Sequence, residues 1–144
     1  KQESSESDSE DSMLSGGGGR ISGKTGGDIV LSMLSMRNQI KLYHWQTRLF
    51  SRHKATDDLV DKLDSNIDTF VEAYMGKYGR PHVVGSIKLH NYSEVTSKKY
   101  VIECRKYLSK ILPKKLSTND TDLLNLRDTI LGDLNQVLYL FTLH

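Results

Sequence analysis

The chain has 144 residues, of which 37% are hydrophobic and 26% are charged, and these values suit one globular domain with a single core. The net charge of +2 is too small to indicate a nucleic-acid partner by itself, and no apolar run approaches the ~20 residues that span a bilayer. The lone Cys104 excludes an intramolecular disulfide and favours a reducing compartment, so we expect a cytoplasmic protein.

The first 27 residues have the composition of a flexible tail. An acidic, Ser-rich block reaches Ser12, and glycines follow at 16–19 and 26–27. Such a composition cannot bury enough apolar area to offset the entropy of ordering, so we expect residues 1–27 to be disordered and residues 28–144 to form the domain. The block carries five acids, which are Glu3, Glu6, Asp8, Glu10 and Asp11.

Four amphipathic patterns follow the tail. Apolar residues at helical spacing predict helices over about 28–52, 54–78 and 93–112, and a fourth that begins near Asn119 or Asp120. Asp28 is the expected N-cap of the first helix, and Pro113 is expected to end the third. The connection over residues 81–91 is longer and has room for a short helical turn. No segment has a convincing strand pattern, so the fold class is all-α and a four-helix bundle is predicted.

Two histidines and three acids in the first two predicted helices form a candidate metal-ligand set, which consists of His44, His53, Asp57, Asp68 and Glu72. Mixed imidazole and carboxylate ligands suit Fe(II), and Zn(II) or Mn(II) can substitute. Two plainer interpretations stay open. Acids on a helix face are usually only solvated, and a lone histidine on an apolar face is more often a core residue than a ligand.

The spacing of these residues excludes one complete site in one chain. Asp57 and Asp68 are eleven residues apart, which is ~16 Å of helix rise, whereas metal–oxygen bonds are ~2.0–2.2 Å long. The five residues can meet if two copies pack this helix antiparallel across a two-fold axis. His44, His53 and Asp57 of one copy then face the Asp68 and Glu72 side chains of the other, which gives two equivalent sites per dimer.

The same residues resemble the ferroxidase signature of Dps, the mini-ferritins of starved cells. The likeness rests on Lys41-Leu-Tyr-His44-Trp45, His53-x-x-x-Asp57 and Asp68-x-x-x-Glu72, and it covers about residues 28–72. A weaker likeness lies in the fourth helix, at Asp133-Leu134 and Tyr139-Leu-Phe141.

The resemblance implies a ferritin-like bundle that assembles into a hollow dodecamer. It also implies an enzyme, a ferroxidase that oxidises Fe(II), preferably with hydrogen peroxide, and stores ferric iron to protect against oxidative damage. The ligands carried over are His44, His53 and Asp57, with Asp68 and Glu72 from the two-fold mate. They would bind two irons, or one iron tightly and a second more weakly, and Trp45 would stand beside the site as a possible radical sink.

The chain departs from the Dps pattern in three ways. The segment between His44 and His53 is about three residues shorter, Gln46 replaces the usual Asn, and the tail is acidic where DNA-binding members carry Lys-rich arms. Because phosphate binding needs Lys or Arg, the acidic tail argues against DNA binding. The segments 52–57 and 74–80 also resemble Dps-like proteins encoded by large DNA viruses. The alternative function is therefore that of a structural, capsid-associated or DNA-packaging protein, located in the virion.

Overall fold

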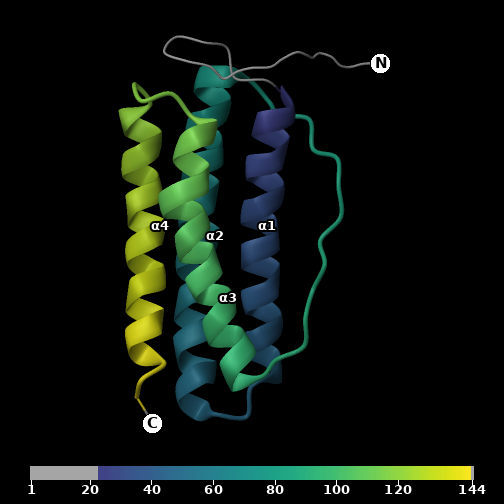
Figure 1. Cartoon of the computed structure of the whole chain (residues 1–144), viewed down its shortest axis with the longest axis vertical. Helices are drawn as coiled ribbons and strands as arrows, with labels where there is room; N and C mark the ends of the chain where they lie inside the picture. The colour runs from purple at the N-terminus through teal and green to yellow at the C-terminus, as the bar shows by residue number, and fades with distance from the viewer. Residues whose placement is uncertain (1–22, 144) are drawn as a thin grey trace.

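The computed structural model describes residues 23–143, which form four long helices packed side by side (Figure 1). They are α1 (Gly23–Gln46), α2 (Phe50–Tyr78), α3 (Glu94–Lys106) and α4 (Thr121–Leu140). No strand occurs among the described residues. The all-α class and the four predicted helices are confirmed, while the disorder predicted for the tail concerns mostly residues 1–22, which lie outside the described residues.

Helix α1 begins five residues before the predicted start. Asp28 lies within the helix, so its predicted N-cap role is wrong, and residues 23–27 are helical although their composition predicts tail. Glycine is a weak helix former, but tertiary contact outweighs that preference here. A Cβ on Gly27 would collide with the backbone carbonyl of His82, and one on Gly26 would lie 3.0 Å from Pro81. The glycine pair therefore lets the chain pass close to the end of α2.

The turn between α1 and α2 is tight. Only residues 47–49 separate the two helices. Helix α1 ends six residues before its predicted end, and α2 begins four residues before its predicted start. Thr47 N–H donates to the Tyr43 carbonyl at 3.0 Å, and His53 N–H donates to the Leu49 carbonyl at 2.9 Å. This turn brings His44, near the end of α1, beside the first turn of α2.

The third helix continues past its α-helical part. A π turn covers Tyr107–Ile111, and a 3-10 turn covers Leu112–Lys115, so the chain stays helical beyond Pro113. Proline has no N–H to donate and its ring clashes with the carbonyl four residues earlier. The wider π turn, closed by the Leu112 N–H on the Tyr107 carbonyl, ends the α-helical ladder before that clash arises. Pro113 therefore changes the helix type instead of ending the helix.

The connection from α2 to α3 runs along the length of α1 (Figure 1). It contains no helical turn, although residues 81–91 have room for one. Two glutamines of α1 hold it through paired hydrogen bonds. The Gln39 amide donates to the His90 carbonyl at 2.8 Å and accepts from the His90 N–H at 2.7 Å, and the Gln46 side chain accepts from the Tyr92 N–H at 2.7 Å. The glutamines stand seven residues apart and so share one helix face.

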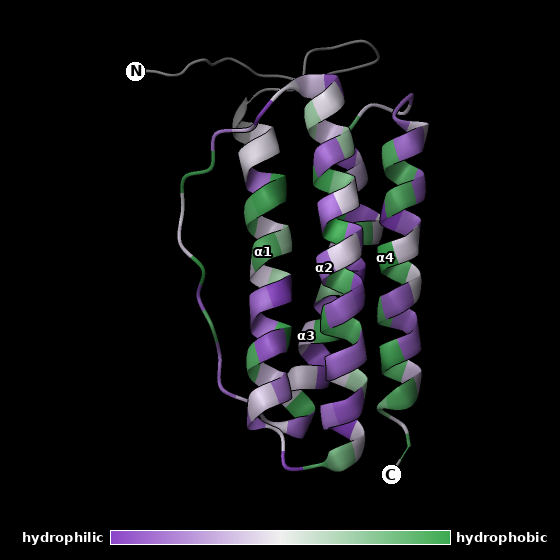
Figure 2. Ribbon diagram, turned by 180° about the vertical axis from the view of Figure 1, so that it is seen from behind, coloured by the Kyte–Doolittle hydropathy of each residue, from purple (hydrophilic) through white to green (hydrophobic). Residues whose placement is uncertain are grey.

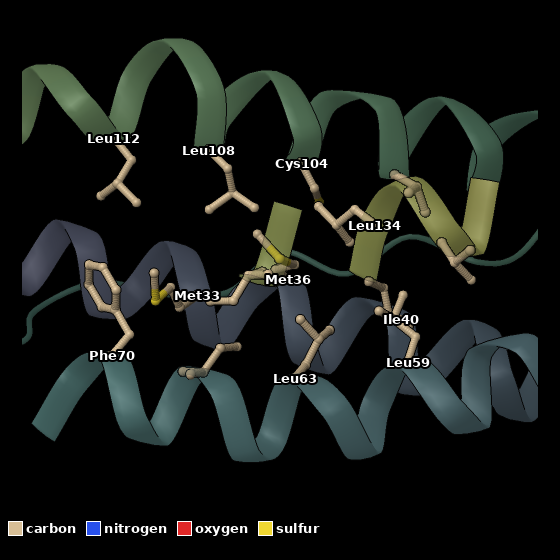
Figure 3. Packing of buried hydrophobic residues seen from close by; sticks show 14 of the residues in the cluster. Met33, Met36, Ile40, Leu59, Leu63, Phe70, Cys104, Leu108, Leu112 and Leu134 are labelled. Carbon is tan, nitrogen blue, oxygen red and sulfur yellow. The ribbon is translucent and has the colours of Figure 1, made fainter. Parts of the chain in front are cut away.

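The apolar faces of the helices meet in one core (Figures 2 and 3). Leu63 and Phe70 of α2, Leu108 of the third helix and Leu134 of α4 are fully buried. Cys104 is also part of the core, and burial raises the pKa of its thiol to about 12. Among residues 23–143, no helix has the length and apolar character needed to cross a membrane.

A buried carboxylate joins the end of α2 to the start of α4. Asp120 is 2% exposed and accepts from Lys77 Nζ at 2.7 Å, from the Tyr78 hydroxyl at 2.6 Å and from the Ser117 N–H at 2.9 Å. Burial alone would raise the pKa of Asp120, but the hydrogen bonds from Lys77, Tyr78 and Ser117 outweigh it and lower the pKa. The predicted cap position is confirmed, although the Asp120 side chain makes no cap hydrogen bond to α4.

Candidate metal centre

The two histidines of the candidate set lie against each other at the α1–α2 turn. Their rings stack with centroids 4.0 Å apart. Nδ1 of His44 lies 2.9 Å from the His53 carbonyl oxygen, and Nδ1 of His53 lies 3.0 Å from the His44 carbonyl oxygen. A carbonyl only accepts, so each Nδ1 carries a proton and donates it. In the neutral rings, each Nε2 then keeps its lone pair, which is the state that binds a metal ion.

Asp57 stands one helical turn after His53 and faces His44. Its Oδ1 lies 3.8 Å from Nε2 of His44, which is the nitrogen left free by the Nδ1 contact. Two atoms that each lie ~2.1 Å from one ion are ~3.0 Å apart when they bind at right angles and ~4.2 Å apart when they bind on opposite sides. The observed separation falls within this interval, so the distance between the two atoms allows both to bind one ion.

Burial differs among the three residues that one chain brings together. His44 is 7% exposed, the Asp57 side chain is about half exposed, and His53 is exposed. Nδ1 of His44 also lies 3.3 Å from the Thr56 hydroxyl, which donates its own proton to the Arg52 carbonyl at 2.7 Å. The site therefore has a fixed, buried imidazole on its inner side and is open to solvent, or to a second molecule, on its outer side.

Asp68 and Glu72 lie farther along α2, both exposed, and the chain does not bring them to the histidines. Among residues 23–143, no group of three or more His, Cys, Asp or Glu side chains is arranged to hold a metal ion. In one chain His44 therefore lies near His53 and near Asp57, but the three do not form a metal site by themselves, and Asp68 and Glu72 lie elsewhere on α2. Completion of the site by a second copy stays a prediction.

A groove between α1 and α2 contains Asp68. It has a volume of about 430 Å³ and a mostly apolar lining. Arg37 and Asp64 bridge the helices there, with Nε to Oδ1 at 2.7 Å and Nη2 to Oδ2 at 3.3 Å, a two-pronged pair that holds one helix to the other. The lining residues are Val30, Leu34, Arg37, Asn38, Leu63, Asp64, Ile67, Asp68 and Val71.

Large apolar side chains of α1 are exposed on the side of this groove. Leu34 is 43% exposed and lines the groove, and Trp45 is 67% exposed. The two residues are eleven positions apart, about three helical turns, so they lie on one face. The Lys41 ammonium stands 5.3 Å from the centre of the Trp45 ring. The face therefore carries apolar area beside the candidate ligands, and Trp45 adjoins His44 in the chain.

Sequence reasoning did not find two features of this region. The exchange of Nδ1–H bonds between the histidines depends on the backbone of the turn, for which spacing gives no signal. The Arg37–Asp64 pair had a weak signal, since an Arg on α1 and an acid on α2 carry opposite charge. Nothing in the sequence selected Asp64 from its acidic neighbours.

Comparison with known proteins gives a match to a protein family. Residues 44–141 match DUF5856, which is described as a family of unknown function. The match begins at His44 and so includes all five candidate ligands. No curated protein and no solved structure matches the chain.

Proposed function

We propose that this chain, which belongs to the DUF5856 family, is a homo-oligomeric, Dps-like protein that binds and oxidises Fe(II) at sites formed between two-fold-related copies. One observation carries the proposal. The two imidazoles exchange Nδ1–H bonds with each other's backbone, which leaves both Nε2 atoms available in the neutral rings, and one of them faces Asp57. A histidine that only packs in the core does not need a free nitrogen that faces a carboxylate.

The order of the acids along α2 supports a two-fold site. His53 and Glu72 are centred on the peptide between Lys62 and Leu63, and so are Asp57 and Asp68. When two copies of a helix pack antiparallel about an axis through that point, residues equidistant from it come to the same level. Asp57 of one copy then stands level with Asp68 of the other, and His53 with Glu72. A single register would complete both pairs at once.

The position of α1 agrees with the same axis. Arg37 pairs with Asp64, and His44 faces Asp57. A step of seven residues along α1 therefore matches a step of seven residues in the opposite direction along α2. By this correspondence Asn38, which lines the groove, lies close to the level of the axis. A second copy on this face would cover the groove and the exposed Leu34 and Trp45, which gives the contact an apolar contribution.

The residues have distinct roles in the proposed reaction. The Nε2 atoms of His44 and His53 bind the first Fe(II), and Asp57 with the partner-supplied carboxylates stabilises the higher charge of Fe(III). Two Fe(II) ions lose one electron each, and one hydrogen peroxide takes up both electrons and two protons, which yields two waters. Ferric iron is then stored within the assembly, for which the Dps resemblance implies twelve subunits.

The experiment compares neighbouring acids with the same charge change. Asp57→Asn or His44→Ala should abolish rapid peroxide-dependent Fe(II) oxidation, measured by ferric absorbance under stopped flow, while sedimentation shows the same oligomer. Asp58→Asn is the matched control, because Asp58 is exposed and points about 100° away around the helix. Unchanged rates in both site variants would refute the proposal, as would an oligomeric wild-type chain without oxidation activity, which would favour a structural role.

A further inference from the structure

The positive charge of the domain is concentrated on one helix. Residues 94–115, which comprise α3 and its π and 3-10 continuation, contain seven Lys and Arg residues against two Glu, a net charge of +5. Residues 28–144 together have a net charge of only +4, so the domain without this helix is at −1. The charge is therefore a local feature of α3 and not a general property of the surface.

These cations form an exposed row. Lys99, Lys106, Lys110 and Lys114 recur at intervals of seven, four and four residues, which places them on one side of the helix, and all four are exposed. Within residues 23–143 none of the four makes an ion pair or a side-chain hydrogen bond. We call this row, together with Lys115, the basic face. Five neighbouring ammonium groups repel one another, so an anionic partner would lower the free energy of the face.

The basic face ends beside the start of α1. Lys115 Nζ lies 3.9 Å from the Asp28 carboxylate, and Asp28 is only five residues, or ~8 Å of helix rise, from Gly23. The chain before Gly23 carries the acidic block, in which all five charged groups of residues 3–11 are carboxylates. The point where this segment joins the domain therefore lies at one end of the basic face.

We propose that the acidic segment of residues 3–11 docks on the basic face of the same chain. The lengths are compatible. Residues 12–22 can span at most ~40 Å, which exceeds the ~22 Å of helix between Lys114 and Lys99. The acidic segment, at ~27 Å when extended, matches the length of the row. The charges also balance, with −5 on the segment and +5 on the helix.

Tethering favours this occupant over external polyanions. A segment joined by eleven residues has an effective concentration in the millimolar range, whereas a free polyanion must reach that concentration to compete equally. The contact consists of exposed charge pairs, each of which is individually weak and screened by salt. Docking should thus be strong at low ionic strength and should cover the face that a nucleic acid would otherwise occupy.

The test measures access to lysine amines in the full-length chain at ~20 mM NaCl. Substoichiometric acetic anhydride labels each lysine, and mass spectrometry gives its rate. We expect Lys106 and Lys110 to react at least threefold more slowly than in a variant whose five tail acids are changed to amides. Lys54 and Lys88, which are exposed elsewhere, should react at equal rates in both chains. The difference should vanish at ~500 mM NaCl.

Charge reversal and cross-linking identify the partner. Lys106→Glu with Lys110→Glu should release the tail and speed labelling of Lys99 and Lys114, whereas Lys54→Glu with Lys88→Glu, an equal change of charge, should not. A carbodiimide should join tail carboxylates to α3 amines as amides with loss of water.

Three results would overturn the proposal. They are equal labelling rates in the wild-type and amide chains, cross-links from α3 lysines to α2 carboxylates of another copy, and equal protection of both chains by a DNA duplex. None of these readouts involves iron, so the outcome is independent of the proposed oxidation.

Discussion

Two inactive variants should restore activity when they are mixed. A chain with His44→Ala and Asp57→Asn lacks the histidine half of the site but keeps Asp68 and Glu72. A chain with Asp68→Asn and Glu72→Gln lacks the opposite half. Every copy of a variant lacks the same half, so neither chain alone can form a complete site in any assembly.

The magnitude follows from the composition of each site. In a random 1:1 mixture, half of the sites take their histidine half from an intact donor, and half of those take their carboxylates from an intact donor, so about one quarter of all sites are complete. This fraction does not depend on whether the assembly has two subunits or twelve. We therefore expect about one quarter of the wild-type rate of Fe(II) oxidation per subunit.

The assay co-refolds the two denatured chains and measures the initial ferric absorbance after peroxide addition. Each variant refolded alone is the control and should give the background rate. Chains mixed after separate refolding should stay at background until subunits exchange. A co-refolded mixture at background rate, with wild-type-like oligomers by sedimentation, would refute a site built from two copies. Activity in either variant alone would refute the assigned ligands.

Two further predictions concern stability and assembly. Asp120→Asn should lower the free energy of unfolding by about 1–2 kcal/mol at pH 7, since it removes a charge-assisted bond to Lys77, whose side chain is 35% exposed and keeps Asp122 as a partner. The lowered pKa of Asp120 means that this contribution is present above ~pH 4 and is lost as the pH falls through the folded-state value, so urea denaturation at pH 3 should show a smaller difference; an equal difference at both pH values would contradict this. The two-fold axis would pass between acids such as Asp61, whose negative charges repel those of the other copy. Anaerobic Mn(II), a redox-inert probe, should therefore tighten the dimer at least tenfold, and Asp61→Asn should tighten the metal-free dimer, both measured by sedimentation. Metal-independent association would count against the proposed axis.

The fold was predictable where periodicity decides it. The second helix was predicted from apolar residues at helical spacing, and those from Leu59 to Tyr74 are buried, because a helix of 29 residues gives many repeats of the pattern. The boundaries were less predictable. The start of α1 depends on how closely Gly27 approaches the His82 backbone, and the end of the third helix depends on a π turn ahead of Pro113. Both are tertiary or local geometric effects that no residue type in the sequence indicates.

The candidate site shows the same division more sharply. Helix rise alone separates Asp57 from Asp68, so a metal site that used both acids would need a second copy, whatever the loops do. Rise says nothing of which nitrogen of His44 is free, because that depends on the His53 carbonyl reached through a three-residue turn. Helix rise also cannot show which face of α2 a second copy would cover, because that face depends on where α1 lies beside α2. Arg37–Asp64 and His44–Asp57 fix that position, and they place Asn38 of α1 near the level of the axis proposed at Lys62–Leu63. The proposed pairing of two chains therefore specifies a single register.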